Sequence, residues 1–349
     1  MLKSLSKKLA IDLGSSKIRI VAVDDLKSEV WELSPLDFRA KVLEEAACLA
    51  RRKDNHKTLA IGNEALAMQG RLDSLAEIVF PFANSRILDR EAALVLLREL
   101  LKKAFGGLVF SPELMLTSSA TATTLTRKLL SQLFYDLGFT KVHLIASPLA
   151  AAIGAGVPIA DTSGTLFLQM GAGSLQMGVI ALGSLLFYEE SSLAGNRLDL
   201  EIVEHLTWQE NFVISLGGAE QLKKQVFSLS PSKKSLALLG KSNTLANPLE
   251  LKIKAEHLQA VVDRFKLELE ILTKSLLAKI PPDLLNDAMA KGLLLSGALA
   301  RIQGLEDFLS TKLNLPVALL DEPDMLAVMG AATMLKNIDS FGQGLSFEI

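Results

Sequence analysis

The sequence contains a single cysteine, Cys48, and only four histidines in 349 residues. One cysteine cannot form a disulfide within the chain, and so few thiols and imidazoles leave no Cys/His cluster of the kind that binds zinc. The formal net charge of -2 provides no positive field to attract nucleic acid. We therefore expect a protein of a reducing compartment, with no nucleic acid among its partners.

Long uninterrupted apolar segments are also missing. No stretch of about 20 apolar, uncharged residues occurs, so we expect no membrane-spanning helix, and the short basic N-terminus does not match a signal peptide. Nevertheless 49% of the residues are hydrophobic, which in a chain of this length supports two or more domains with large cores. We expect a soluble cytoplasmic protein whose only route to a membrane is peripheral contact.

Two parts of the chain repeat one pattern of strand, glycine turn and strand. Residues 8–23 hold two apolar runs separated by a turn at 14–16, and residues 165–182 hold two more, separated by 171–174. Alternating strands and helices follow each pair, including helices expected at 90–105 and 124–137. The repetition predicts an internally duplicated α/β fold.

The second half gives further expectations. A long amphipathic helix is expected at 254–279, closed by the two prolines at 281 and 282. Residues 228–247, rich in Ser, Lys, Leu and Asn, are expected to form a surface loop with short strands. Small residues crowd the segment 150–156 before the next strand.

A hairpin turn of small residues exposes backbone N–H groups that can bind phosphate. One such turn is most often an ordinary hairpin turn, but two, one from each half, could grip a polyphosphate between them. The residues that we assign to this role are Asp12, Gly14, Ser15, Ser16 and Lys17 in the first turn and Gln169, Gly171, Ala172, Gly173 and Ser174 in the second. A third turn, at Gly297 and Ala298, suits either the adenosine side of a nucleotide or a plain strand-to-helix connection.

Several segments, taken in order, resemble the MreB family of bacterial actins. Residues 11–15 resemble its first phosphate loop, and residues 148–156 resemble its first connecting segment. The other matching segments are residues 59–65, 194–199, 280–285 and 321–323. The resemblance covers residues 9–338 and implies an actin-like, ribonuclease H-like duplicated fold, in which two α/β domains enclose a nucleotide cleft.

The resemblance also implies domain boundaries. Domain I would hold residues 1–145 and 324–340, with a small subdomain inserted at about 30–75. Domain II would hold residues 146–323, with a subdomain inserted at about 196–262, and residues 341–349 would form a tail.

The function implied by the resemblance is that of a cytoskeletal protein. Such a protein binds ATP or ADP, polymerises into filaments on the inner face of the cell membrane and helps to determine cell shape by organising cell-wall synthesis. Its partners would be further copies of itself, the membrane surface, and the cell-wall synthesis machinery or a paralogous MreB.

The family pattern implies further nucleotide contacts. Gly195 and Asn196 fall in the segment that resembles its Gly-Gly-Asp-x-x-Asp turn, and Glu220 and Lys223 match its pair for the adenine and ribose. A spacing of three places both side chains on one helix face, although an ordinary surface ion pair has the same spacing. Leu299, in place of a family glycine, could block part of the base site.

Several departures from the family pattern argue against efficient hydrolysis. Gln169 replaces the Asp that holds Mg²⁺ through water, which leaves Asp12 as the metal candidate. Thr124 and Thr126 occupy the stretch where the family carries its water-activating Glu, and neutral Thr is a poor base. We expect at most a weak ATPase, with ATP or ADP and Mg²⁺ as cofactors.

An apolar loop at residues 105–110 connects an expected helix to an expected strand, and exposed apolar clusters usually mark an interface. The resemblance implies a loop that enters the bilayer. The candidate membrane residues are Leu108, Val109 and Phe110, helped by Lys3, Lys7 and Lys8. The alternative is that Phe105 and Val109 cap the core.

The resemblance also implies membership of the superfamily that actin shares with sugar kinases and DnaK-type chaperones, which has other functions. A non-hydrolysing actin-fold adaptor, which would regulate another filament or a wall-synthesis protein, fits the loss of the family's Asp and Glu equally well. A small-molecule kinase would need a catalytic Asp near a sugar pocket, and Asp136, on an expected helix, is the only Asp in the relevant stretch. A DnaK-type chaperone would need a peptide-binding domain after residue 340.

Overall fold

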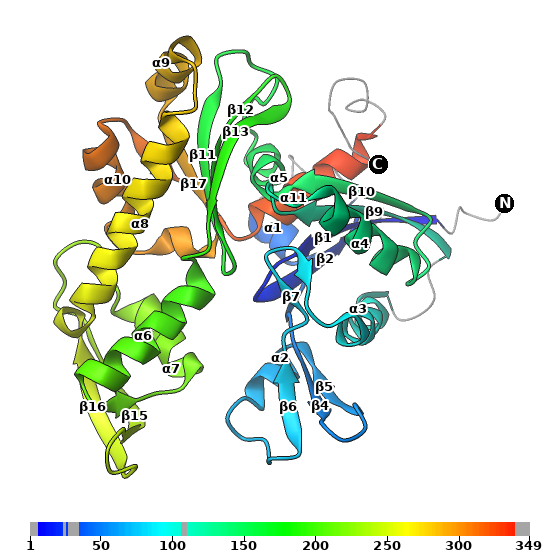
Figure 1. Cartoon of the computed structure of the whole chain (residues 1–349). Helices are drawn as coiled ribbons and strands as arrows, with labels where there is room; N and C mark the ends of the chain where they lie inside the picture. The colour runs from blue at the N-terminus through cyan, green and yellow to red at the C-terminus, as the bar shows by residue number, and fades with distance from the viewer. Residues whose placement is uncertain (1–5, 24–25, 27–34, 106–109, 339–349) are drawn as a thin grey trace.

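The computed structural model describes residues 6–23, 26, 35–105 and 110–338. Two five-stranded sheets form the centres of two lobes, which stand side by side in Figure 1. The sheet of lobe I has the order β10-β9-β1-β2-β3, and that of lobe II has the order β13-β12-β11-β17-β18. The strands of lobe I are β1 (Ser6–Leu13), β2 (Lys17–Ala22), β3 (Leu43–Ala46), β9 (Phe110–Ser118) and β10 (Lys141–Ala146). Those of lobe II are β11 (Thr165–Met170), β12 (Leu175–Ala181), β13 (Ser184–Ser191), β17 (Leu293–Ser296) and β18 (Val317–Leu319).

The two sheets have the same topology. In each, the predicted hairpin, β1–β2 or β11–β12, pairs antiparallel and continues into a third antiparallel strand, β3 or β13. On its other side, the first strand of each hairpin pairs in parallel with a later strand, β9 or β17. The duplicated α/β fold predicted from the repeated pattern is thus confirmed.

Each lobe carries a smaller sheet. In lobe I it consists of β4 (Leu49–Arg52), β5 (Thr58–Ile61) and β6 (Ala76–Val79), with helix α2 (Gly62–Ala67) beside it. In lobe II it consists of β14 (Phe212–Val213), β15 (Ser235–Ser242) and β16 (Pro248–Lys254), with α6 (Gly195–Gln209) and α7 (Leu216–Gln225). Both lie at the lower end of the molecule in Figure 1. The domain boundaries drawn from the resemblance remain predictions.

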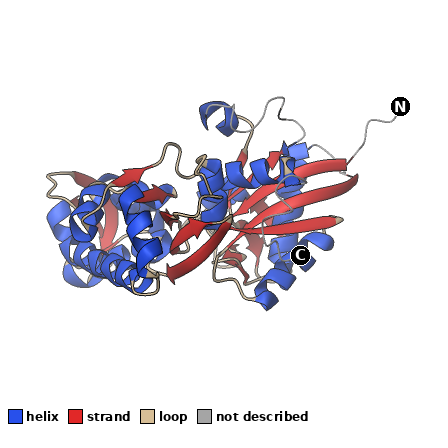
Figure 2. Ribbon diagram, turned by 90° about the horizontal axis from the view of Figure 1, so that it is seen from above, coloured by secondary structure: helices blue, strands red, loops and turns tan. Residues whose placement is uncertain are grey.

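The remaining helices surround the two large sheets (Figure 2). Lobe I has α1 (Pro35–Arg39), α3 (Arg90–Phe105) and α4 (Thr124–Tyr135), and lobe II has α8 (Gln259–Leu277), α9 (Pro282–Lys291) and α10 (Leu305–Leu313). The short elements are β7 (Phe82–Ala83), β8 (Arg86–Ile87), η3 (Ala255–Leu258) and η4 (Ala298–Arg301). The helix predicted at 90–105 is confirmed to the residue, whereas the expected helix at 254–279 begins with η3 and continues as α8.

Two further helices, α5 (Ser147–Gly154) and α11 (Leu326–Lys336), lie between the sheets (Figure 1). They share one hydrophobic cluster with Ala10 and Met115 of lobe I and Phe167 and Ile180 of lobe II. Ten of the eleven residues of α11 are buried. Burial of apolar surface is the main favourable term in folding, so these two helices bind the lobes to each other.

The two helices touch backbone to backbone. A Cβ atom added to Gly330 would overlap the carbonyl group of Ala150 and lie 2.9 Å from the backbone nitrogen of Gly154. One added to Gly154 would overlap the carbonyl oxygen of Leu326. Only glycine allows so close an approach at these positions.

We expect Gly330→Ala to lower the free energy of unfolding by about 2–3 kcal/mol, because the added methyl group must push α5 and α11 apart. The matched control is Gly217→Ala on α7, where the nearest atom would be 3.8 Å away. There the alanine should stabilise the helix by about 0.5–1 kcal/mol. Urea unfolding measures both, and equal midpoints for the two variants would contradict the tight crossing.

Candidate functional site

The two predicted phosphate turns, one at the end of β1 and one at the end of β11, meet between the lobes. The hydroxyl of Ser15 accepts a hydrogen bond of 3.0 Å from the backbone nitrogen of Asn84. A Cβ atom on Gly173 would overlap the side chains of both Ser15 and Asn84. The structure therefore brings the two turns into contact, with glycine required on the lobe II side.

Both turns have the same internal hydrogen bond. Gly14 N–H donates to the carbonyl of Lys17 at 3.1 Å, and Gly171 N–H donates to that of Ser174 at 2.9 Å. Within the described part of the chain, five other turn amides have no acceptor: those of Ser15, Ser16, Ala172, Gly173 and Ser174. Backbone N–H groups exposed in facing turns are the donors that bind an anion in a phosphate loop.

The N-terminus of α6 holds the second turn in place. The amide of Gly195 donates to the carbonyl of Gly171 at 3.2 Å, and the amide of Asn196 donates to that of Ala172 at 2.7 Å. Gly195 and Asn196, predicted to contact the nucleotide, are thus adjacent to the second turn. Their amides, however, are used by the turn itself, so these residues shape the turn.

Lys223 reaches the same place from α7. Its Nζ donates to the carbonyl oxygen of Gly195 at 2.9 Å and pairs with Asp199 Oδ2 at 2.6 Å. Burial raises the pKa of Asp199 to about 6, even though Lys223 acts to lower it. Glu220, which the sequence places on the same helix face as Lys223, has a different partner and pairs with Lys224 at 2.6 Å.

Charges of the opposite lobe also act on Glu220. Burial tends to raise the pKa of Glu220, but Lys224, Lys223 and, from lobe I, Lys17 lower it overall. Lys17, assigned above to the first phosphate turn, forms an ion pair with Glu44 on β3 and remains about half exposed. The site is therefore bordered by charged groups from both lobes.

A row of polar residues crosses the sheet of lobe I beside the first turn. Asp12 is the cross-strand partner of Arg19, and Arg19 is the partner of Glu44. Asp12 Oδ2 lies 3.3 Å from Arg19 Nη1, and Asp12 Oδ1 accepts a hydrogen bond from Thr117 Oγ1 at 2.7 Å. Sequence reasoning missed Arg19, although an arginine inside the apolar run of β2 was a signal that it needs a buried partner.

The equivalent row in lobe II is almost uncharged. Gln169 is the cross-strand partner of Gln176 and of Ser296, and Gln176 is the partner of Glu190. Gln169 and Gln176 thus stand where Asp12 and Arg19 stand in lobe I. Gln169 Nε2 donates to Ser147 Oγ at 3.0 Å, while Gln169 Oε1 and Ser296 Oγ are buried without a partner in the described residues.

This second row also joins the lobes directly. The amide of Ala120, in the loop after β9, donates to Gln176 Oε1 at 2.8 Å. In the same loop, Ser119 Oγ donates to Glu190 Oε2 at 2.8 Å, and Thr121 Oγ1 donates to the same oxygen. Sequence reasoning did not identify Gln176, Glu190 or Ser119, whose roles depend on contacts between distant segments.

Comparison with known proteins agrees with this architecture. Residues 6–343 match the MreB/Mbl protein family. The chain belongs to the MreB/Mbl family. It is 26% identical over 337 residues to the cell shape-determining protein Mbl of Bacillus subtilis (strain 168), covering 96% of this chain and 97% of Mbl.

The solved structures confirm the actin-like fold. MreB5 of Spiroplasma citri bound to AMPPNP superposes with a TM-score of 0.89 at 22% identity, covering 98% of this chain and 99% of that one. The same protein has been solved bound to ADP. A MamK double helical filament gives a TM-score of 0.76 at 17% identity, with 95% and 99% covered.

The residues present do not fit the Mg²⁺ ion that an MreB/Mbl nucleotide site implies. Both oxygens of Asp12 already accept hydrogen bonds, one of them from a guanidinium. Its counterpart in lobe II is the uncharged Gln169. Among the described residues, no three His, Cys, Asp or Glu side chains gather to hold a metal ion. Asp12 therefore has partners other than the metal for which it was proposed.

Other predicted residues of this MreB/Mbl chain contact neighbours within their own lobes. Thr124 and Thr126 belong to the first turn of α4, where the amide of Thr126 donates to Thr123 Oγ1 at 3.2 Å. Asp136 caps the other end of this helix and pairs with Arg90. Leu299, proposed to block part of the base site, packs into the core of lobe II.

The predicted membrane loop is only partly visible. Leu108 and Val109 lie outside the described residues, as does Lys3, and Phe110 begins β9. Phe105 packs against the core of lobe I. In the described segments, no helix has the length and apolar character needed to cross a membrane.

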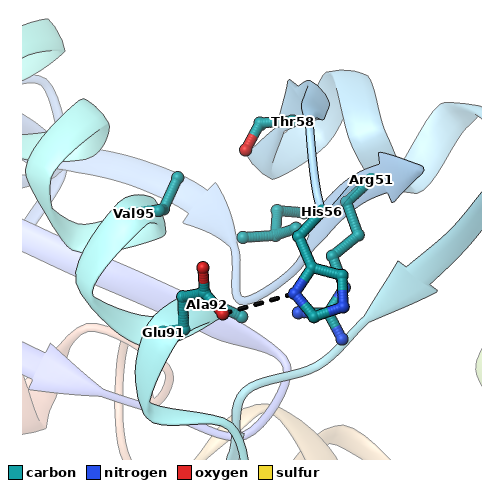
Figure 3. A pocket seen from close by; sticks show the side chains of 7 residues that line it. Arg51, His56, Thr58, Glu91, Ala92 and Val95 are labelled. Carbon is teal, nitrogen blue, oxygen red and sulfur yellow. Dashed lines mark hydrogen bonds and ion pairs between the residues drawn. The ribbon is translucent and has the colours of Figure 1, made fainter. Parts of the chain in front are cut away.

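The small hollow in Figure 3 is separate from the turns. It is lined by Leu49 and by the labelled residues Arg51, His56, Thr58, Glu91, Ala92 and Val95. His56 Nδ1 lies 3.3 Å from Glu91 Oε2. The hollow has a volume of about 20 Å³, enough for about one water molecule, and is therefore too small for a nucleotide.

A cluster of ion pairs extends the lobe I row to the connection between β18 and α11. Arg39 of α1 donates to Asp324 at 2.8 Å, and Arg301 of η4 donates to it at 2.9 Å. Arg19 Nη2 lies 3.4 Å from the same carboxylate. Burial by itself would raise the pKa of Asp324, but the three arginines outweigh it and lower the pKa to about 2.

The pKa of Asp324 makes a prediction about acid stability. A carboxyl group with a depressed folded pKa stabilises the fold above its unfolded pKa of about 4, and this contribution disappears as the pH falls to about 2. The difference in unfolding free energy between wild type and Asp324→Asn should thus shrink by about 2 kcal/mol from pH 5 to pH 2. Urea unfolding across this range is the measurement, and a difference that stays constant would contradict the assignment.

Proposed function

We propose that this chain binds ATP or ADP between its two lobes and polymerises into filaments on the inner face of the cell membrane. There it would help to determine cell shape by organising cell-wall synthesis. The observation that carries the nucleotide site is the pair of facing turns, whose five unpartnered amides in the described structure come from both lobes. Such an arrangement suits a chain of phosphates, because each turn can bind one end of it.

The family supplies the support for the cellular part of the proposal. Mbl of Bacillus subtilis is named for determining cell shape, and MamK was solved as a filament. Filaments require a heterologous contact that repeats from one subunit to the next. Weak membrane binding by single subunits would then be multiplied by avidity along the filament.

We propose that hydrolysis is slow. An attacking water needs a positioned proton acceptor, and the row beside the second turn offers the amides of Gln169 and Gln176 and the hydroxyl of Ser147. The carboxylate of Asp199, which is also near this turn, is paired with Lys223. The carboxylate in this row, Glu190, already accepts hydrogen bonds from Ser119 and Thr121. A bound nucleotide would therefore be retained as a structural ligand.

A second candidate function is a non-hydrolysing adaptor that regulates another filament. The hydrogen bonds from Ala120 to Gln176 and from Ser119 to Glu190 favour it. They join the lobes through protein groups alone, so they can fix the shape of the molecule in any nucleotide state.

Nucleotide binding is tested with Gly173→Ala. The methyl group would separate the two turns, and we expect the affinity for ADP to fall about tenfold or more, a change of about 1.4 kcal/mol. Gly217→Ala should bind ADP as the wild type does. Isothermal titration gives both values. Unchanged ADP affinity in Gly173→Ala would show that the turns are not part of the nucleotide site.

Polymerisation is tested on the wild type by sedimentation at increasing protein concentration, with phosphate release followed on the same samples. A filament protein should pellet above a critical concentration and release phosphate slowly. If the protein binds nucleotide but stays in the supernatant at every concentration, the filament function is refuted and the adaptor function is supported.

A further inference from the structure

Arg19 occupies the position at which Asp12 could otherwise hold a cation. The two residues face each other across β1 and β2, with Arg19 Nη1 3.3 Å from Asp12 Oδ2. The second oxygen of Asp12 accepts a hydrogen bond from Thr117. The side chains of Arg19 and Asp12 are only 9% and 12% exposed, so this pair is formed largely out of water, where opposite charges interact strongly.

Neighbouring strands hold the guanidinium in place. Arg19 Nε donates to Glu44 Oε2 at 2.8 Å on the side away from Asp12, and Nη2 lies 3.4 Å from Asp324. A guanidinium has five N–H groups in a rigid plane and stays protonated at all physiological pH values. Three of the five have carboxylate acceptors, and the other two have no acceptor among the described residues.

A divalent cation next to Asp12 would be opposed by this arrangement. Mg²⁺ in a nucleotide site is typically held by one or two carboxylates together with the phosphates. Here the carboxylate of Asp12 is already neutralised, and the ion would lie within a few ångströms of a permanent positive charge. Lobe II offers no replacement, because the equivalent pair consists of Gln169 and Gln176.

We propose that Arg19 takes the place of a divalent cation beside the phosphates, so that this chain binds nucleoside diphosphates and triphosphates without Mg²⁺. The inference rests on the proposed nucleotide site and adds the identity of the cation that serves it. Asp12, which lies two residues before the first turn, then acts as a positioning residue that fixes the guanidinium.

The test is a titration of the full chain with ATP and with ADP, each in EDTA and in Mg²⁺. For the wild type we expect dissociation constants that agree within about twofold in the two buffers. Arg19→Met should weaken binding in EDTA about tenfold or more, and Mg²⁺ should restore part of the loss, because Asp12 is then free to attract it.

Arg39→Met is the matched control, since it removes another arginine of the same ionic cluster that does not contact Asp12. It should bind nucleotide in EDTA within about twofold of the wild type. Arg19→Lys keeps the charge without the planar fork and should lie between the wild type and Arg19→Met. Thermal unfolding of each variant shows whether it is folded.

The wild type alone can overturn the inference, without any variant. Binding that is tenfold or more tighter in Mg²⁺ than in EDTA would refute the role of Arg19 and leave the proposed nucleotide site standing. Failure to bind nucleotide in either buffer would refute both.

Discussion

The arrangement of the molecule depends on the crossing of α5 and α11. Most residues of these two helices are apolar and buried, and the helices meet at Gly154 and Gly330 with backbone against backbone. Because both sheets pack on this pair of helices, the crossing fixes where the ends of β1 and β11 lie. The contact between the two glycine turns, and every group that borders it, follows from that position.

Around the turns, the duplicated frame carries two different chemistries. Lobe I places a carboxylate and a guanidinium at the paired positions before its turn, and lobe II places two amides at the same positions. A buried charge is tolerated only with a partner, which explains why Asp12, Arg19 and Glu44 occur as neighbours in one row. The amides of lobe II need no such compensation, and they are free to form hydrogen bonds across the lobes.

Local features of the sequence predicted the hairpins well, since strand alternation and glycine turns act over a few residues. The elements that were missed lack such a local signal. Helix α5 is buried on most sides, so its small apolar residues show no helical period. Helix α9 was hidden by Pro281 and Pro282, which we interpreted as the end of a helix, whereas Pro282 begins the next one. The surface loop with short strands expected at 228–247 contains β15, a strand of eight residues that pairs with β16.

The sequence by itself determined the class of protein, the two turns and most residues that line them, because those features are encoded in short segments and in their order along the chain. Only the tertiary structure decided how these residues are used. Asp12 meets Thr117 across 105 positions of sequence, and Arg19 meets Asp324 across 305. Such contacts are set by the packing of the two lobes on α5 and α11. No local pattern in the sequence specifies which buried carboxylate receives which arginine.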